Sequence, residues 1–214
     1  MKRKNVIVML SAAMLGTVVL SGCGGGSAYK KADKTTGSID ALRAELLSSK
    51  KQIDKMMSAL NEVVAMANTD PRPAYESFKK EFANTNKQAE KVRKRADDIR
   101  KQGQAYFKKW EAQFEKVSSP QMKQQFEQRK AEMAAKYQKI QQYSELVDAD
   151  YKAFVRDIGD IQVVLGVDLT AKGIKSVSDT VTHATQQAQT IYEHINTYVS
   201  ILNEVSVAMS PSGK

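Results

Sequence analysis

Apolar residues recur at alternating steps of three and four over most of the chain between residues 39 and 209. The first such stripe consists of Ile39, Leu42, Leu46, Ser49, Ile53, Met56, Leu60, Val63 and Ala67. This spacing puts the apolar side chains on one face of an α-helix, as in coiled coils and helical bundles. A half-buried β-strand needs alternation with a period of two, so the pattern predicts an all-α fold.

Three further stripes follow, and residues that end or interrupt helices separate them. The second stripe consists of Tyr75, Phe78, Phe82, Thr85, Ala89, Val92, Ala96, Ile99, Gly103, Tyr106, Trp110, Gln113 and Val117. The third consists of Phe126, Lys130, Met133, Tyr137, Ile140, Ser144, Val147, Tyr151, Phe154, Ile158, Ile161 and Leu165. The fourth consists of Ile174, Val177, Val181, Ala184, Ala188, Ile191, Ile195, Tyr198, Leu202, Val205 and Met209. We therefore expect helices over about 31–68, 73–118, 120–165 and 173–209.

Four such helices with short connections predict an elongated antiparallel up-down-up-down four-helix bundle with coiled-coil-like heptad packing. It would form a single domain over 31–209, and we expect the tail 210–214 to fray. Ser119 and Pro120 favour a hairpin between the second and third helices, with one continuous kinked helix as the alternative. The stripes also leave open whether the core closes within one chain or between the chains of a homo-oligomer.

Residues 1–22 have the pattern of a signal peptide that is removed on export. Three basic residues are followed by an apolar run of about 15 residues, which is too short to span a bilayer. The run ends in Leu20, Ser21 and Gly22 before Cys23, and this ending resembles the lipobox of bacterial lipoproteins. The resemblance implies cleavage after Gly22 and attachment of acyl chains, including palmitate, to Cys23.

A lipidated Cys23 would anchor the chain to a membrane, because two or three acyl chains bind stably where one binds marginally. Cys23 is the only cysteine, so the fold contains no disulfide within the chain. The glycine-rich residues 23–30 predict a flexible tether. Gly24 follows the cysteine where an Asp would retain a lipoprotein at the inner membrane, so we expect the periplasmic face of the outer membrane.

The chain has 33 Lys and Arg against 24 Asp and Glu, a net charge of +9. Loss of residues 1–22 removes three basic residues and no acidic one, which leaves 30 against 24, or +6. This balance favours anionic lipid, a cell-wall polymer or an acidic envelope protein as partner. We expect no nucleic acid as a partner, because the chain is predicted to be exported.

The second and third helices are predicted to be longer than the other two, so their shared turn would project beyond the bundle at the lipidated end. Large aromatics and lysines near this turn suit a bilayer interface or a partner surface. The candidate contact residues are Phe107, Lys108, Lys109, Trp110, Phe114 and Lys116. The alternative is that Trp110 and Tyr106 belong to the core stripe and the lysines form a solvated face. Phe107 and Phe114 lie off the stripe and favour the contact hypothesis.

Residues suited to catalysis or metal binding are sparse. His183 and His194 are eleven residues apart, or about 16 Å along a helix, too far to share one metal ion. Asp97 and Asp98 lie among basic residues and indicate local ion pairs rather than an acid–base pair. We therefore expect no catalytic residues, no metal site, no cofactor and no enzymatic activity.

Two segments resemble an uncharacterised bacterial family of exported coiled-coil proteins, catalogued as domain of unknown function 2959. They are Tyr29–Ser38 (YKKADKTTGS) and the stretch that contains Phe154, Asp160, Ile161, Leu165, Asp168, Leu169, Gly173 and Ile174. The resemblance covers residues 29–209 and implies an all-helical envelope protein, without an activity to carry over.

The leading hypothesis is a non-enzymatic, lipid-anchored helical scaffold or spacer of the bacterial cell envelope. The alternative is a binding module that captures an anionic envelope polymer, a lipid surface or a partner protein through basic faces or an exposed stripe. The two hypotheses make different demands on the protein surface, since only a binding module needs a defined contact site.

Overall fold

The computed structural model describes the backbone of residues 28–209 and the side chains of residues 34–209. This part of the chain forms the helices α1 (Ala28–Ala65), α2 (Arg72–Phe114), α3 (Pro120–Val167), α4 (Ala171–Ser176) and α5 (Ser178–Met209). No strand occurs among residues 28–209, so the predicted all-α class is confirmed. The signal peptide 1–22, the lipobox with Cys23, most of the tether and the tail 210–214 lie outside the described residues.

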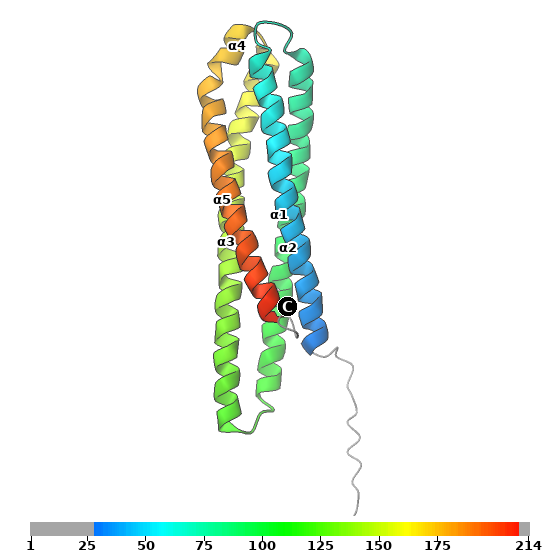
Figure 1. The fold of residues 1–214 in the computed structure, drawn as a ribbon, viewed down its shortest axis with the longest axis vertical. Helices are drawn as coiled ribbons and strands as arrows, with labels where there is room; N and C mark the ends of the chain where they lie inside the picture. Colours follow the sequence, from blue (N-terminus) through cyan, green and yellow to red (C-terminus); the bar gives the residue numbers. More distant parts are fainter. Residues whose placement is uncertain (1–27, 210–214) are drawn as a thin grey trace, which may run out of the picture.

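The four long helices lie side by side along one axis, and the short α4 sits at one end (Figure 1). The α1–α2 connection lies at that same end, whereas the α2–α3 connection lies at the other. α1 packs on α2 and α5, and α3 packs on α5 and α2. Of these four contacts, the one between α2 and α3 is the least extensive. The result is a helical bundle with its core between the four long helices.

The predicted stripes supply this core. In α1 every stripe residue from Ile39 to Val63 is buried, and so is every member of the fourth stripe from Ile174 to Met209. Fully burying one Leu or Ile side chain contributes about 1.5–3 kcal/mol, so these two helices hold much of the stabilising surface. Burial along α2 and α3 is less regular, and the sites described below lie where it is interrupted.

The hairpin between α2 and α3 replaces the alternative of one continuous kinked helix. α2 ends at Phe114 and α3 begins at Pro120, where the proline ring already has a helical φ angle. The Ser119 hydroxyl accepts a hydrogen bond from the Met122 backbone N–H and caps the new helix. The Ser119 cap and Pro120 stabilise the start of α3 directly after the connection, so a new helix begins here instead of a continuation of α2.

The predicted single helix over 173–209 is wrong in one respect, because it is divided into α4 and α5. Thr170 caps α4 by accepting a hydrogen bond from the Gly173 backbone N–H. At Val177 the backbone leaves the helical region (φ −96°, ψ 0°), although the side chain stays buried in the core. The apolar periodicity continues through this break, and for that reason the sequence pattern does not reveal it.

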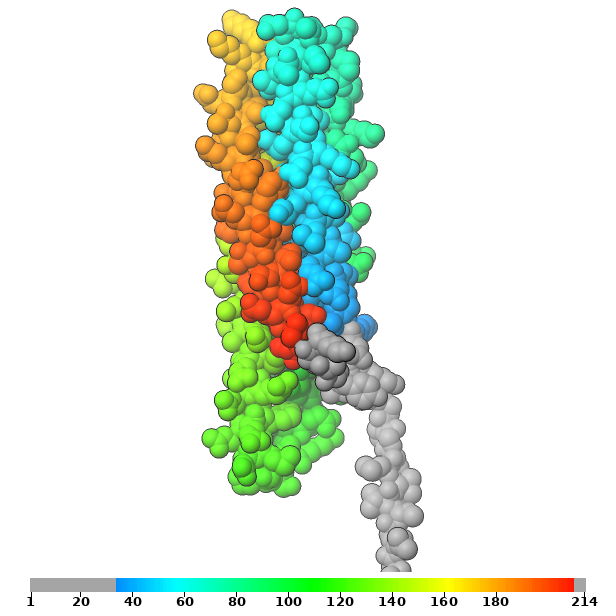
Figure 2. Space-filling view, viewed as in Figure 1, coloured from blue at the N-terminus to red at the C-terminus, as the bar shows by residue number. Residues whose placement is uncertain are grey.

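α2 and α3 project beyond the other helices at the end where α1 begins (Figures 1 and 2). They contain 43 and 48 residues, against 38 in α1 and 32 in α5. Met209, at the end of α5, lies level with Tyr137, whose hydroxyl is 3.7 Å from the methionine sulfur. We call residues 104–132 the overhang, and none of them is fully buried.

Gly103 permits the close approach of α2 to α3 directly above the overhang. A Cβ atom at this position would lie 2.4 Å from Cε1 of Tyr137, whose ring is buried. We expect Gly103→Ala to lower the free energy of unfolding by about 1–3 kcal/mol, because the Tyr137 ring or the helix must move. Urea unfolding followed by circular dichroism measures the change.

Gly159 is the matched control for Gly103, since it also lies inside a helix but a Cβ there would meet no atom within 4 Å. Gly159→Ala should raise the free energy of unfolding by about 0.5–1 kcal/mol, because alanine loses less conformational freedom on folding. Equal effects of the two substitutions would contradict the packing role of Gly103.

Candidate functional site

Apart from Tyr75 near the start of α2, the stripe residues of α2 and α3 that escape full burial lie in two places. One is midway along the bundle, where Val92, Ala96 and Ser144 are half-buried. The other is the overhang, where Trp110 and Phe126 are half-buried. Both places lie along the α2–α3 contact, and they are the two candidate sites.

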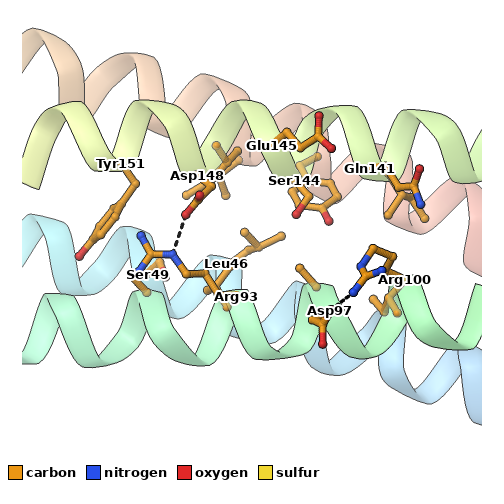
Figure 3. Close-up of a pocket in the computed structure, with 18 of the residues that line it drawn as sticks. Leu46, Ser49, Arg93, Asp97, Arg100, Gln141, Ser144, Glu145, Asp148 and Tyr151 are labelled. Atoms are coloured by element: carbon orange, nitrogen blue, oxygen red, sulfur yellow. Dashed lines mark hydrogen bonds and ion pairs between the residues drawn. The ribbon is translucent and has the colours of Figure 1, made fainter.

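The first site is a cavity of about 390 Å³ that opens between α2 and α3, which we call the α2–α3 cleft (Figure 3). Its floor comes from the opposite side of the bundle and is apolar, with Leu46 and Ile53 from α1 and Ile191 and Ile195 from α5. Tyr137 and Tyr151 line it near its two ends along α3. The volume lies in the range of pockets that take small organic ligands.

Small side chains at core positions explain why the cleft is hollow. Ser49, Ala89, Ala96 and Ser144 all line it and all occupy stripe positions. Large aliphatic residues at such positions normally fill the centre of a bundle at close-packed density. Here the lack of side-chain volume coincides with the least extensive contact between neighbouring helices, so space remains.

One end of the cleft mouth is crossed by an ion pair. Arg93 donates from Nε to the Asp148 carboxylate at 2.6 Å, and Lys152 approaches the other carboxylate oxygen at 2.6 Å. Partial burial by itself raises the pKa of Asp148, but the hydrogen bonds from Lys152 and Arg93 outweigh it and hold this pKa below its usual value. The Arg93 guanidinium also lies 5.6 Å from the centre of the Tyr151 ring.

A second ion-pair cluster lies further along α2. Lys101 and Arg100 contact the two oxygens of Asp97 at 2.6 and 2.5 Å. Their hydrogen bonds lower the pKa of Asp97. Arg100 and Arg93 are seven residues apart, about 10 Å along the helix, and both face the cleft mouth in Figure 3.

Tyr198 places a polar group deep in the cleft. Its side chain is 1% exposed and lines the cavity. Its hydroxyl is buried, and among the described residues it has no partner in well-aligned hydrogen-bond geometry. Burial raises the pKa of Tyr198 to about 12, and the nearby Ser144 hydroxyl moderates this increase. At neutral pH the phenol is therefore protonated and able to donate.

The second site is the overhang, which contains the six contact residues predicted from sequence. The Phe114 ring stacks on Phe126 of α3 with ring centroids 5.8 Å apart, and the Trp110 ring packs on Phe126 at a tilt with centroids 4.7 Å apart. Phe107 meets Tyr137 edge-on at 5.3 Å. The sequence placed Phe107 and Phe114 off the stripe, but the structure puts both in the α2–α3 contact.

The predicted lysines of the overhang differ in exposure. Lys108 and Lys116 are exposed, whereas Lys109 is half-buried. Lys123 adds a further cation 5.4 Å from the centre of the Phe114 ring. The overhang therefore combines half-buried aromatic rings with exposed cations, a combination that suits an interface between water and lipid.

The two histidines lie on α5 and pair separately with acids of α3. His183 contacts Asp157 at 2.7 Å, and His194 contacts Asp150 at 2.5 Å. No group of three or more His, Cys, Asp or Glu side chains among the described residues is arranged to hold a metal ion. In the same part of the chain, no helix combines the length and apolarity needed to cross a bilayer.

Sequence reasoning found the overhang residues but missed the α2–α3 cleft. The signal was present, because Ser49, Ala89, Ala96 and Ser144 break an otherwise bulky stripe in three helices. These small residues do not by themselves predict a cavity, because a large side chain from the facing helix can fill the space that a small one leaves. Which residues share a level depends on the stagger of the helices, and single stripes do not contain that information.

The fold and the two sites define an all-α helical-bundle protein with a lateral apolar cleft and an aromatic overhang. The chain belongs to the family described as protein of unknown function (DUF2959), whose model matches residues 27–206. This match confirms the resemblance seen in the two sequence segments. Neither a curated protein nor a solved structure matches the chain.

The Arg93–Asp148 pair gives a prediction for the pH dependence of stability. We expect Asp148→Asn to lower the free energy of unfolding by about 1 kcal/mol at pH 7. The pKa of Asp148 in the folded protein lies below its usual value of 3.8, so its contribution to stability is present above pH 3.8 and is lost as the pH falls through the folded pKa. Unfolding curves between pH 7 and pH 2.5 should show the two proteins converging at the acidic end.

Asp160→Asn is the control for this measurement, since Asp160 is exposed and takes part in none of the ion pairs described. It should leave the stability unchanged within about 0.5 kcal/mol. A difference between wild type and Asp148→Asn that stays constant down to pH 2.5 would contradict the role given to this carboxylate.

Proposed function

We propose that the protein is a non-enzymatic, lipid-anchored helical scaffold or spacer of the bacterial cell envelope. The proposed location is the periplasmic face of the outer membrane, with acyl chains on Cys23 as the anchor. The lipobox of Leu20, Ser21, Gly22 and Cys23 and the export signal before it support this proposal.

The observation that carries the proposal is the shape of the bundle. α3 has 48 residues and is about 72 Å long at 1.5 Å per residue, and the core runs along most of it. The first described residues and the overhang lie at the same end (Figure 1). A membrane anchor that precedes α1 would therefore bring the overhang close to the bilayer, and the opposite end would extend away from it.

The proposed working form is an antiparallel up-down-up-down four-helix bundle with heptad packing, in which α4 and α5 together act as the fourth helix. Hydrogen bonds between side chains of α1 and α5 support a core that closes within one chain, as in Lys50 to Asn196 at 2.8 Å. Tyr192 on α5 likewise donates to Asp54 on α1. A homo-oligomer would then form through outer faces rather than through exchange of the core.

The second candidate function is a binding module for an anionic envelope polymer, a lipid surface or a partner protein. The overhang favours it, because rings held by only two helices stay half-exposed beside Lys108 and Lys116. Nucleic acid is not proposed as a partner. The two functions are compatible, since contact of the overhang with the membrane would hold an anchored spacer in a defined orientation.

The lipid anchor is tested by metabolic labelling with an alkyne-tagged palmitate analogue in a bacterium that processes lipoproteins. We expect the wild-type chain to incorporate the label and to fractionate with membranes. Cys23→Ser should abolish labelling and release the protein from membranes, with an unchanged circular dichroism spectrum because Cys23 precedes the bundle. Labelling of Cys23→Ser at the wild-type level would refute the anchor.

The contact role of the overhang is tested by vesicle sedimentation with the triple variant Lys108→Gln, Lys109→Gln and Lys116→Gln. Each basic residue near an anionic surface contributes about 1 kcal/mol, so binding to anionic vesicles should fall about 100-fold. Wild-type binding should weaken as salt rises, because the lysines are screened. The control variant carries Lys51→Gln, Lys87→Gln and Lys91→Gln, three exposed positions outside the overhang. Equal loss in the two variants would show a nonspecific charge effect and reject the overhang as the contact site.

A further inference from the structure

We propose that the α2–α3 cleft is a binding site for an anionic amphiphile with a single acyl chain, whose chain occupies the cavity and whose carboxylate or phosphate lies at Arg93 and Arg100. This inference goes beyond the scaffold role and does not depend on the lipid anchor.

The cavity has the size and chemistry of a site for an apolar molecule. It measures about 390 Å³, whereas an engineered apolar cavity of about 150 Å³ in another protein already binds benzene. Leu46, Ile53, Ile191 and Ile195 form its floor and offer no hydrogen bonds from their side chains. Natural bundles fill such positions with large side chains, so a cavity of this size at the centre of one indicates a ligand.

The shape of the cavity favours a chain over a compact ring system. Its lining extends from Tyr137 to Tyr151, which are fourteen residues or about 21 Å apart along α3. One leaflet of a bilayer core is about 15 Å thick, half of the roughly 30 Å of the whole. A membrane-derived acyl chain therefore has a length that the cleft accommodates along the bundle axis.

Arg93 and Arg100 supply the cationic contacts for an anionic head group at the mouth. Asp148 is paired with both Arg93 and Lys152, so this cluster keeps one positive charge. Asp97 is paired with both Arg100 and Lys101, with the same result. Glu145 is a further acid at the mouth, so the charged side chains that line the cleft are two arginines and three acids. Lys101 and Lys152 contact two of these acids from outside the lining and bring the seven side chains together to one net positive charge.

The arginines also retain hydrogen-bonding capacity. Arg93 donates from Nε to Asp148 and Arg100 donates from one terminal nitrogen to Asp97. A guanidinium has five N–H donors, so both side chains have donors left for a carboxylate or phosphate.

A polar anchor inside the cleft provides an independent observation. Tyr198 is 1% exposed and lines the cavity. Its buried hydroxyl lies near the Ser144 hydroxyl but has no partner in aligned hydrogen-bond geometry among the described residues. Buried hydroxyls are nearly always hydrogen-bonded in native proteins. An oxygen atom of the bound molecule, or a water molecule that enters with it, would satisfy this donor.

Photocrosslinking of the full chain in nanodiscs of zwitterionic lipid tests the proposal. The probes are hexadecanoic acid, a monoacyl phosphatidic acid and hexadecanol, each with a diazirine at the chain end. We expect the two anionic probes to label residues that line the cleft, as mapped by mass spectrometry, at a yield at least fivefold above that of hexadecanol. The better of the two anionic probes identifies the head group as carboxylate or phosphate.

Two variants separate the cavity from the mouth. Ala96→Phe fills the cavity and should reduce labelling by both anionic probes at least tenfold, whereas Ala44→Phe, at an exposed position of α1, should leave it unchanged. The double variant Arg93→Gln and Arg100→Gln changes exposed side chains and should reduce labelling by the anionic probes at least fivefold but not by hexadecanol. Circular dichroism checks that each variant folds.

Labelling of wild type outside the cleft, or of Ala96→Phe at the wild-type yield, would overturn the site. Hexadecanol labelling equal to that of both acids would overturn the anionic head group, and so would undiminished labelling by the acids in the arginine double variant. If Ala96→Phe fails to fold, the arginine double variant and the map of labelled residues still decide the proposal.

Discussion

Burial of one apolar stripe on each long helix is the interaction on which the remainder of this structure depends. The chain has no disulfide, and its ion pairs are largely at the surface, where each contributes little. Stability must therefore come from side chains such as Leu42, Phe154 and Leu202, which are fully buried between helices. Such a core tolerates local departures from the pattern, because the neighbouring layers still hold the helices together.

Both candidate sites occur where this burial is incomplete, and both lie along α2 and α3. At the cleft all four long helices are present, but small side chains do not fill the space between them. At the overhang the rings of Trp110 and Phe126 pack on each other and on neighbouring rings of α2 and α3, but they stay half-buried. The two sites thus have one origin, since the α2–α3 contact is the least extensive of the four.

Polar side chains provide part of the interaction between α2 and α3 along this contact. Arg93 bridges to Asp148 across the cleft mouth, and Tyr151 donates to Asn86 on α2 at 3.2 Å. Tyr75 similarly donates to the Gln162 backbone carbonyl at 2.9 Å near the opposite end of the bundle. These bonds hold α2 at a defined position relative to α3 without closing the cavity, which is the condition for a stable opening in a bundle wall.

The sequence by itself determined the helical class, the stripes that form the core and the longer second and third helices, because each follows from spacing within one segment. Ser119 and Pro120 also marked the hairpin, since capping is a local interaction. Only the tertiary structure showed the break at Val177, the contact of Phe107 with Tyr137, and the cleft at Ala96. Burial of Val177 preserves the periodicity through the break, and the other two features depend on which residues of separate helices lie at the same level. That alignment is set by helix stagger and crossing angle, which no single stripe encodes.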